Sequence, residues 1–236
     1  MPTIEMIAKE VTRNTTQLHK RSLKITPEER LKRINKYFFK TVVPMLEEFY
    51  PEAKKYYVKR EKASRKLGKI KTKSVGEIDK LSVKGDLRQA SSYSAKMDLI
   101  GDTDLDMIYA VKNLTEEKLL TIATELGKIG FKYIERRGAE GPNKRWMFNK
   151  YINNVEIDLG VRDYNLALPV LNLHKKIDNK LEKRDKELIT FGKYKLKNLS
   201  KTNPKFRTAY ADFKYLFYQA MFSSVKNSYM MRELNN

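Results

Sequence analysis

Residues 91–106 read Ser-Ser-Tyr-Ser-Ala-Lys-Met-Asp-Leu-Ile-Gly-Asp-Thr-Asp-Leu-Asp. The run 103–111, which overlaps the end of this stretch, predicts a buried strand, and a strand places alternate side chains on one face. Asp104 and Asp106 therefore point the same way, while the apolar residues beside them face the core. No basic residue adjoins this acidic pair in the sequence, so the pair is costly unless cations neutralise it.

A second run with the same alternation lies at residues 154–160, which read Asn-Val-Glu-Ile-Asp-Leu-Gly. Its apolar residues are expected to face inward, whereas Glu156 and Asp158 face outward. If this strand neighbours the first, Asp158 completes a cage of three carboxylates with Asp104 and Asp106. Hard oxygen ligands of this kind suit Mg²⁺.

A pair of small residues, a gap of about a dozen residues, Asp-x-Asp on a strand and a lone later Asp form a recognisable combination. It resembles the signature of the DNA polymerase beta-like nucleotidyltransferase superfamily. It is particularly similar to that of the archaeal-type CCA-adding enzymes and the poly(A) polymerases, which read roughly G-S-Y-A-K-G-T-x-L-x-G-x-x-D-I-D. The positions that fall in register are Ser91, Ser92, Tyr93, Leu99, Gly101, Asp104 and Asp106.

The resemblance implies nucleotidyl transfer with two Mg²⁺ or Mn²⁺ ions about 3.5–4 Å apart and a nucleoside triphosphate such as ATP as substrate. It assigns Asp104 and Asp106 to both ions and Asp158 to the ion that activates the acceptor. Ser92 is expected to hold the β- and γ-phosphates. Ser91 stands where the family has glycine, which lets backbone approach the triphosphate closely.

The C-terminal part of the chain is expected to be helical, with its clearest helix at residues 204–222. Lys214 and Tyr218 are four residues apart on it and share a surface. In the family a helical domain after the palm supplies a lysine to the triphosphate and a ring to the base. The resemblance gives these roles to Lys214 and Tyr218, and the other interpretation is that they are ordinary surface residues. His174 lacks the family's flanking motif and is predicted to be an ordinary helix histidine.

The remaining signals predict an α+β fold. Thr26-Pro27-Glu28-Glu29 can cap a helix, which Pro44 should kink or divide. Asn113-Leu-Thr-Glu116 predicts a second helix start, and Asn153-Asn154 a hairpin turn before the Asp158 strand. The order strand, strand, helix, strand, hairpin predicts a small mixed-sheet nucleotidyltransferase palm with flanking helices on one side and a C-terminal helical region.

These signals suggest a division into three parts. Residues 1–25 form an N-terminal arm, either a short helix or flexible. Residues 26–162 form the palm with its leading helix and a basic segment, and residues 163–236 form a helical C-terminal domain. No apolar run approaches membrane-span length, and cysteine is absent. The sequence therefore predicts a soluble cytoplasmic protein, cellular or viral, without a membrane partner.

A formal net charge of +20 indicates a polyanionic partner. Residues 54–73 hold ten Lys and Arg against one acid. They are either a solvated helix end and loop or a clamp for phosphates, with Tyr56 and Tyr57 available for stacking on bases. Lysines between 175 and 201 form a second basic tract. The residues that we assign to nucleic-acid binding are Lys62, Arg65, Lys66 and Lys69.

The favoured function is template-independent addition of nucleotides to an RNA 3′ end, of the poly(A) polymerase or CCA-adding type, with RNA favoured over DNA. Three alternatives remain at this point. They are a cyclic or 2′-5′ oligonucleotide synthase, a small beta-type DNA polymerase, and a non-catalytic RNA-binding subunit on a decayed palm.

Overall fold

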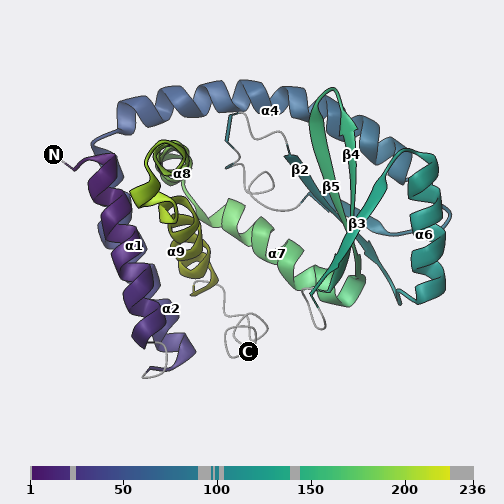
Figure 1. The fold of residues 1–236 in the computed structure, drawn as a ribbon, viewed down its shortest axis with the longest axis horizontal. Coiled ribbons are helices and arrows are strands. Elements are labelled where there is room, and N and C mark those ends of the chain that lie inside the picture. Colours follow the sequence, from purple (N-terminus) through teal and green to yellow (C-terminus); the bar gives the residue numbers. More distant parts are fainter. Residues whose placement is uncertain are drawn as a thin grey trace. The chain divides into compact units, whose positions relative to one another are not determined.

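The computed structural model describes residues 2–21, 25–89, 97, 99–100, 104–138 and 144–223. The chain divides into two compact units. The first joins Met1–Lys59 to Asn179–Asn236, and the second is Arg60–Asp178. Helix α4, Tyr50–Ile78, belongs to both units and appears as the long blue helix in Figure 1. The division into 1–25, 26–162 and 163–236 stays a prediction about domains.

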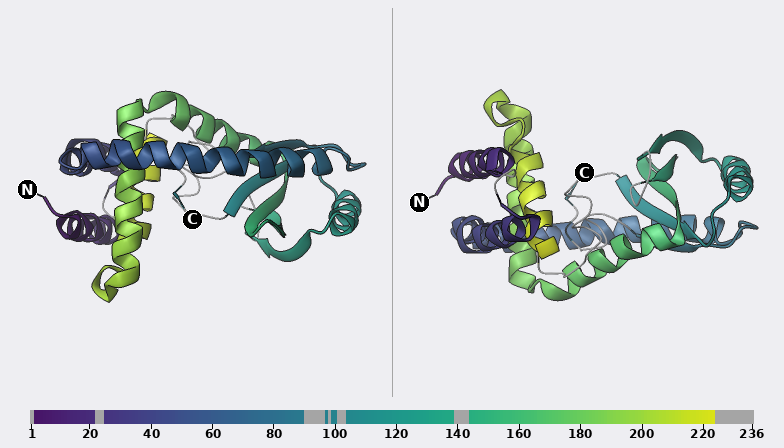
Figure 2. Two further views of the ribbon diagram at one scale, coloured as in Figure 1. Left: turned by 90° about the horizontal axis from the view of Figure 1, so that it is seen from above. Right: turned by 90° about the horizontal axis from the view of Figure 1, so that it is seen from below.

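The first unit consists of helices, and residues 4–21 take the helical alternative predicted for the arm. Helix α9 packs against α1, α2 and α8 (Figure 2). Besides the beginning of α4, the described elements are α1 Ile4–Arg21, α2 Pro27–Tyr37, the π-helix η1 Phe38–Val42, α3 Val43–Glu47, α8 Lys183–Thr202, the 3-10 helix η3 Pro204–Phe206 and α9 Ala209–Ser223.

Two sequence signals explain how the first unit begins. The Thr26 hydroxyl accepts a hydrogen bond from the Glu29 backbone N–H at 3.2 Å, which caps α2 as predicted. Pro44 lies in the first turn of α3, directly after the π-helical turn, so it divides the helix as predicted. Proline has no N–H to donate to the preceding turn, and a widened turn is one way to absorb that loss.

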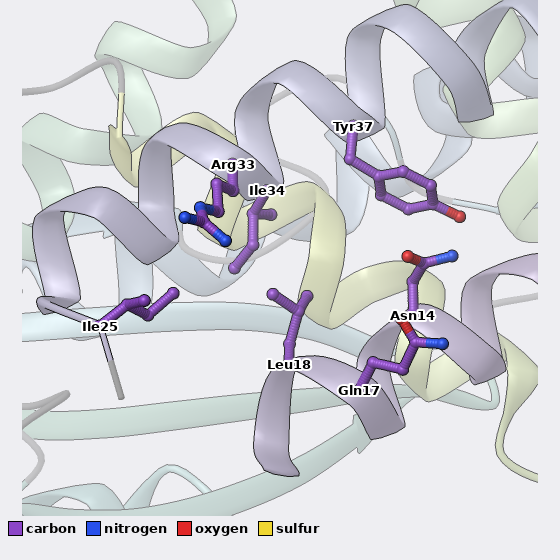
Figure 3. Close-up of a pocket in the computed structure, with 7 residues that line it drawn as sticks. All are labelled: Asn14, Gln17, Leu18, Ile25, Arg33, Ile34 and Tyr37. Atoms are coloured by element: carbon purple, nitrogen blue, oxygen red, sulfur yellow. The ribbon is translucent and has the colours of Figure 1, made fainter. Parts of the chain in front are cut away.

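A small hollow of about 140 Å³ lies between α1 and α2 (Figure 3). Two of its polar side chains have partners within the unit: the Tyr37 hydroxyl donates to Glu10 Oε1 at 3.3 Å, and Arg33 pairs with Glu29 at 2.5 Å. Burial, followed by the nearby Glu10 carboxylate, raises the pKa of Tyr37 well above its usual value. These contacts stabilise the packing of α1 on α2, and none of them requires a ligand.

The second unit is a five-stranded mixed sheet in the order β1-β2-β5-β4-β3 (Figure 1). β2 and β5 are parallel, and the other neighbours are antiparallel. This confirms the predicted α+β fold with a mixed sheet. The elements are β1 Asp86–Gln89, β2 Asp104–Val111, α6 Glu116–Lys128, β3 Lys132–Arg137, β4 Arg145–Ile152, β5 Val155–Asp163 and α7 Tyr164–Lys180.

Helices cover both faces of this sheet, so the prediction that they lie on one side was wrong. On one face Ile122 and Leu126 of α6 pack with buried residues of β2 and β5. This cluster, which includes Leu105, Met107, Ile157 and Leu159, is the main core of the second unit. On the other face Ala167 of α7 and its neighbours pack on Ile108 and Ala110 of β2. The reason is local, because the face that carries Asp104 and Asp106 becomes apolar two residues later along the same strand.

The chain reversals mostly follow the sequence. Asn153 and Asn154 have φ of 51° and 62°, the left-handed conformation that a tight hairpin needs, and they join β4 to β5 as predicted. Helix α6 is capped by Thr115, whose hydroxyl accepts from the Lys118 N–H at 3.3 Å, and not by Asn113. Asn113 has a φ of 49°, which does not fit the extended backbone of an N-cap.

None of the described helices is both long enough and apolar enough to cross a membrane.

Gly85 lies just before β1, where the backbone runs close to the core of the sheet. A Cβ at this position would lie 2.8 Å from Tyr109 Cζ and 3.0 Å from the Ala110 carbonyl oxygen. Tyr109 cannot easily move away, because it is 1% exposed and its hydroxyl donates to the Val83 carbonyl at 2.7 Å. Gly85 is therefore required by the packing of the ring.

We expect Gly85→Ala to lower the free energy of unfolding by about 1–3 kcal/mol, the usual cost of overpacking. Gly68→Ala is the matched control, because Gly68 lies in α4 with nothing within 4 Å of its Cβ position. That substitution should raise stability by up to about 1 kcal/mol. Chemical denaturation of both variants measures the difference, and equal stabilities would contradict the role of Gly85.

Candidate functional site

Four carboxylates come together where β2 lies beside β5. The parallel register places Asp106 opposite Asp158 and Asp104 opposite Glu156. Residues opposite each other on adjacent strands share a face, so all four side chains belong to one face of the sheet. The condition that the sequence analysis set for a three-carboxylate site, that the Asp158 strand neighbours the Asp-x-Asp strand, is therefore met.

The environment of these carboxylates is electrostatically unfavourable. Asp104 is exposed, whereas Asp106 and Asp158 are half-buried. Burial, followed by repulsion from Glu156, Asp106 and Asp104, raises the pKa of Asp158 to about 6. A proton or a cation would relieve this repulsion.

The donors suit a hard divalent cation in type, since they are carboxylate oxygens concentrated on one face. As the side chains lie, however, no three His, Cys, Asp or Glu residues in the described part of the chain form a group that could hold a metal ion. The backbone thus brings the predicted ligands to adjacent positions, and a metal site would further require their side chains to converge.

Sequence reasoning placed Glu156 on the same face as Asp158, but it missed the polar partners of Glu156 on β4. The Glu156 carboxylate accepts a hydrogen bond from the Asn149 amide at 3.0 Å, and its hydrogen bond with Tyr151 raises the pKa of that phenol. These contacts hold Glu156 beside Asp158. A signal existed, because Glu156 alternates with Asp158, but its partners lie on another strand.

Two arginines also belong to this face. Arg145 is half-buried and lies opposite Arg137 of β3, and its Cδ lies 3.6 Å from the Cβ position of Gly160. Burial, followed by repulsion from Arg137, lowers the pKa of Arg145, whereas Asp106 raises it. Arg137 also lowers the pKa of Asp158. Both cations therefore lie within electrostatic reach of the acidic cluster.

The other predicted nucleotide-binding residues lie outside the described residues or in the first unit. Ser91 and Ser92 lie outside the described residues. Lys214 and Tyr218 are half-buried on α9, in the first unit. The Lys214 Nζ lies 5.4 Å from the centre of the Tyr210 ring, and Tyr218 contacts Phe217. Their roles stay predictions, and the His174 side chain is also outside the described part.

The first basic tract lies within one continuous helix, α4, and not in a helix end and loop. Lys62, Arg65 and Lys69 are exposed and recur at helical spacing, so they share a face. Lys66 is the remaining residue of this stripe by its spacing in the sequence, and its side chain is outside the described part. The stripe's contact with nucleic acid stays a prediction.

One other part of the nucleic-acid prediction was wrong. Tyr56 and Tyr57 are 8% and 3% exposed, and Tyr56 stacks on Tyr194 with ring centres 4.3 Å apart, so neither ring is available to a base. In the second basic tract, Lys193 is 1% exposed, and Lys195 pairs with Glu52 at 3.3 Å. The contact of this tract with nucleic acid stays a prediction.

No protein-family model and no curated protein sequence matches this chain. Among solved structures, the Cid1 poly(U) polymerase bound to Mg and 3′-dATP aligns with 72% of this chain and 53% of its own, at 15% identity and a TM-score of 0.52. A cytoplasmic RNA terminal U-transferase aligns with 66% of this chain and 46% of its own, at 17% identity and a TM-score of 0.47. GrpB from Enterococcus faecalis aligns with 69% of this chain and 94% of its own, at 16% identity and a TM-score of 0.47.

The likeness to the Cid1 enzyme shows that this chain has a nucleotidyltransferase palm fold. It agrees with the resemblance to the DNA polymerase beta-like superfamily at the level of fold, and it does not single out the CCA-adding or poly(A) group. The other two likenesses are too weak to carry a conclusion. The chain spans about half the length of the polymerase that it matches.

The raised pKa of Asp158 predicts how pH and Mg²⁺ affect stability. In the folded protein Asp158 binds its proton more tightly than in the unfolded chain. Its contribution to stability is therefore present below its ordinary pKa of 3.8 and is lost as pH rises through about 6. Without metal, wild type should lose stability from pH 5 to pH 7 relative to Asp158→Asn.

Mg²⁺ should oppose this loss of stability in wild type at pH 7. It competes with the Asp158 proton, so the increase in melting temperature on adding Mg²⁺ should be larger at pH 7 than at pH 5 in wild type. Asp158→Asn should show a smaller increase at pH 7 and less dependence on pH. Calorimetry with EDTA or with Mg²⁺ measures both effects, and an equal response of the two proteins would argue against Asp158 as a ligand.

Proposed function

We propose that this protein is a metal-dependent nucleotidyltransferase that adds nucleotides from a nucleoside triphosphate to an RNA 3′ end without a template. The observation that carries the proposal is the register of Asp106 with Asp158, beside Asp104, on adjacent strands of a nucleotidyltransferase-like palm. The excess of basic residues supports a nucleic-acid substrate.

Asp104, Asp106 and Asp158 would hold two Mg²⁺ or Mn²⁺ ions. Such ions, when bound, lower the pKa of the acceptor hydroxyl and stabilise negative charge on the α-phosphate and the leaving pyrophosphate. Asn149 holds Glu156 by a hydrogen bond, so Glu156 keeps negative charge beside Asp158. This charge favours the cation-bound form of the site over the empty form. Arg145 and Arg137 are cations on the same face that would attract the triphosphate.

Ser91 and Ser92 are proposed to bind the phosphates of the nucleotide, and Lys214 and Tyr218 the triphosphate and the base. The basic stripe of α4 is proposed to bind the RNA backbone.

Product analysis tests this proposal against its alternatives. The purified chain is incubated with Mg²⁺, one labelled nucleoside triphosphate at a time, and short single-stranded RNA, single-stranded DNA or a gapped DNA duplex. A ladder or a single addition on RNA supports 3′-end transfer. Extension only of a gapped DNA, a small product formed without acceptor, or no product at all would instead support the polymerase, the oligonucleotide synthase or the non-catalytic subunit.

Asp104→Asn and Asp106→Asn should each lower turnover at least about 10³-fold, because each removes a charged ligand while keeping the side chain's shape. Folding should survive, since repulsion on this face decreases. Glu117→Gln is the control, because Glu117 is an exposed carboxylate on α6, against the other face of the sheet. More than a tenth of wild-type activity in either Asn variant would refute the assignment.

The stripe on α4 makes a separate prediction about salt. Each cation that neutralises a phosphate of a single strand contributes a slope of about −0.7 to log K against log salt. Replacing the four stripe residues with glutamine should therefore flatten the slope by up to about 3. The substituted residues are Lys62, Arg65, Lys66 and Lys69.

The control removes the same charge from exposed lysines elsewhere. Its substituted residues are Lys32, Lys80, Lys128 and Lys205. Filter binding or fluorescence anisotropy at several salt concentrations gives both slopes. If the two quadruple variants change the slope equally, the stripe has no specific part in binding and only net charge matters.

A further inference from the structure

A groove of about 510 Å³ lies between the first half of α6 and strands β3 and β4. It is on the sheet face opposite to the carboxylates, because Trp146 is in register with Val161 of β5 and packs on the main core. One wall is formed by Leu119 and Leu120 of α6, and the floor includes Trp146 and Phe148. The groove is thus separate from the candidate active site.

A β-bulge gives this groove its aromatic and cationic residues. Tyr133 and Arg136 are three residues apart and would lie on opposite faces of a regular strand. The register shift between Tyr133 and Glu135 brings Tyr133 opposite Phe148 and Arg136 opposite Trp146. Both side chains therefore line the groove.

The groove exposes apolar surface beside cations. Leu120 and Tyr133 are 70% and 56% exposed, an unusual cost unless something covers them. The Lys144 Nζ and the Arg136 Cζ lie 5.4 Å and 6.0 Å from the centre of the Trp146 ring. Aromatic rings interleaved with cations are the arrangement that binds bases and phosphates of a single strand together.

We propose that this groove is a second binding site for single-stranded nucleic acid, in which a base stacks on Tyr133 and the flanking phosphates contact Arg136 and Lys144. The site is distinct from the carboxylate face and does not depend on catalysis. An amphipathic acidic peptide would also suit the leucine wall. The nucleic-acid occupant is favoured because the cations adjoin the rings and the chain carries a net charge of +20.

Trp146 is the only tryptophan of the chain, so its fluorescence reports on this groove alone. The full-length protein is titrated with a short oligouridylate in EDTA and without nucleoside triphosphate. We expect quenching of Trp146 by the oligouridylate, weaker quenching by an abasic oligomer with the same phosphates, and the least by inorganic polyphosphate. Equal effects of all three would show charge attraction without base binding and would overturn the proposal.

Variants of Tyr133 sharpen the test. Tyr133→Ala should weaken the quenching titration about tenfold, as expected for loss of one stacked base, whereas Tyr133→Phe should retain it. Tyr151→Ala is the matched control, because Tyr151 is 64% exposed on the same sheet but opposite Glu156, on the carboxylate face. Melting temperatures show that each variant is folded.

Two further measurements test the groove independently of catalysis. Asp158→Asn should quench as wild type does, so failure of the transferase assay and failure of this assay are distinguishable. If oligouridylate leaves Trp146 unchanged while a synthetic peptide of alternating leucine-rich and glutamate-rich turns shifts its emission to the blue, the groove is a protein-docking site and the proposal is wrong.

Discussion

The parallel pairing of β2 with β5 is the constraint on which the site depends. On the core face the pairing joins Leu105 to Ile157 and Met107 to Leu159, and all four are at most 2% exposed. Burial of an apolar side chain of this size contributes about 1.5–3 kcal/mol, so this register is strongly favoured. A shift by one residue would turn Asp158 into the core.

The same pairing imposes a cost on the opposite face. Carboxylates that repel each other lie in register, and burial, followed by this repulsion, raises the pKa of Asp158 from 3.8 to about 6. The corresponding free energy is at most a few kcal/mol, and less after screening by solvent. The apolar face outweighs it, so the fold can maintain an acidic cluster that would not assemble by itself.

Sequence patterns predicted the parts of this structure that depend on neighbours in the chain. Alternation identified β2 and β5, Thr26 and Pro44 marked helix boundaries, and Asn153-Asn154 marked the hairpin. Such signals depend on local backbone preferences, which a single sequence records. The pairing of β2 with β5 entered the sequence analysis only as a condition, because alternation alone does not say which strands are neighbours.

What sequence could not show depends on contacts between distant segments. Tyr56 lies within a basic run, yet it stacks on Tyr194 of α8, and no local pattern indicates a partner so far along the chain. The place of Arg145 beside the carboxylate face follows from the β4 register. The bulge in β3 likewise has no glycine that would predict it from the sequence. It places Tyr133 and Arg136 on the same face of the sheet.

The acidic cluster and the strongly basic chain have opposite effects on a polyanion. A net charge of +20 attracts nucleic acid from a distance, within the limit that salt sets. At the cluster itself four carboxylates repel phosphate, and the arginines at positions 137 and 145 offset only part of that charge. Productive contact between RNA and this face therefore requires further positive charge at the carboxylates. Divalent cations are the species that carboxylates of this kind attract, which links the electrostatics of the face to the proposed chemistry.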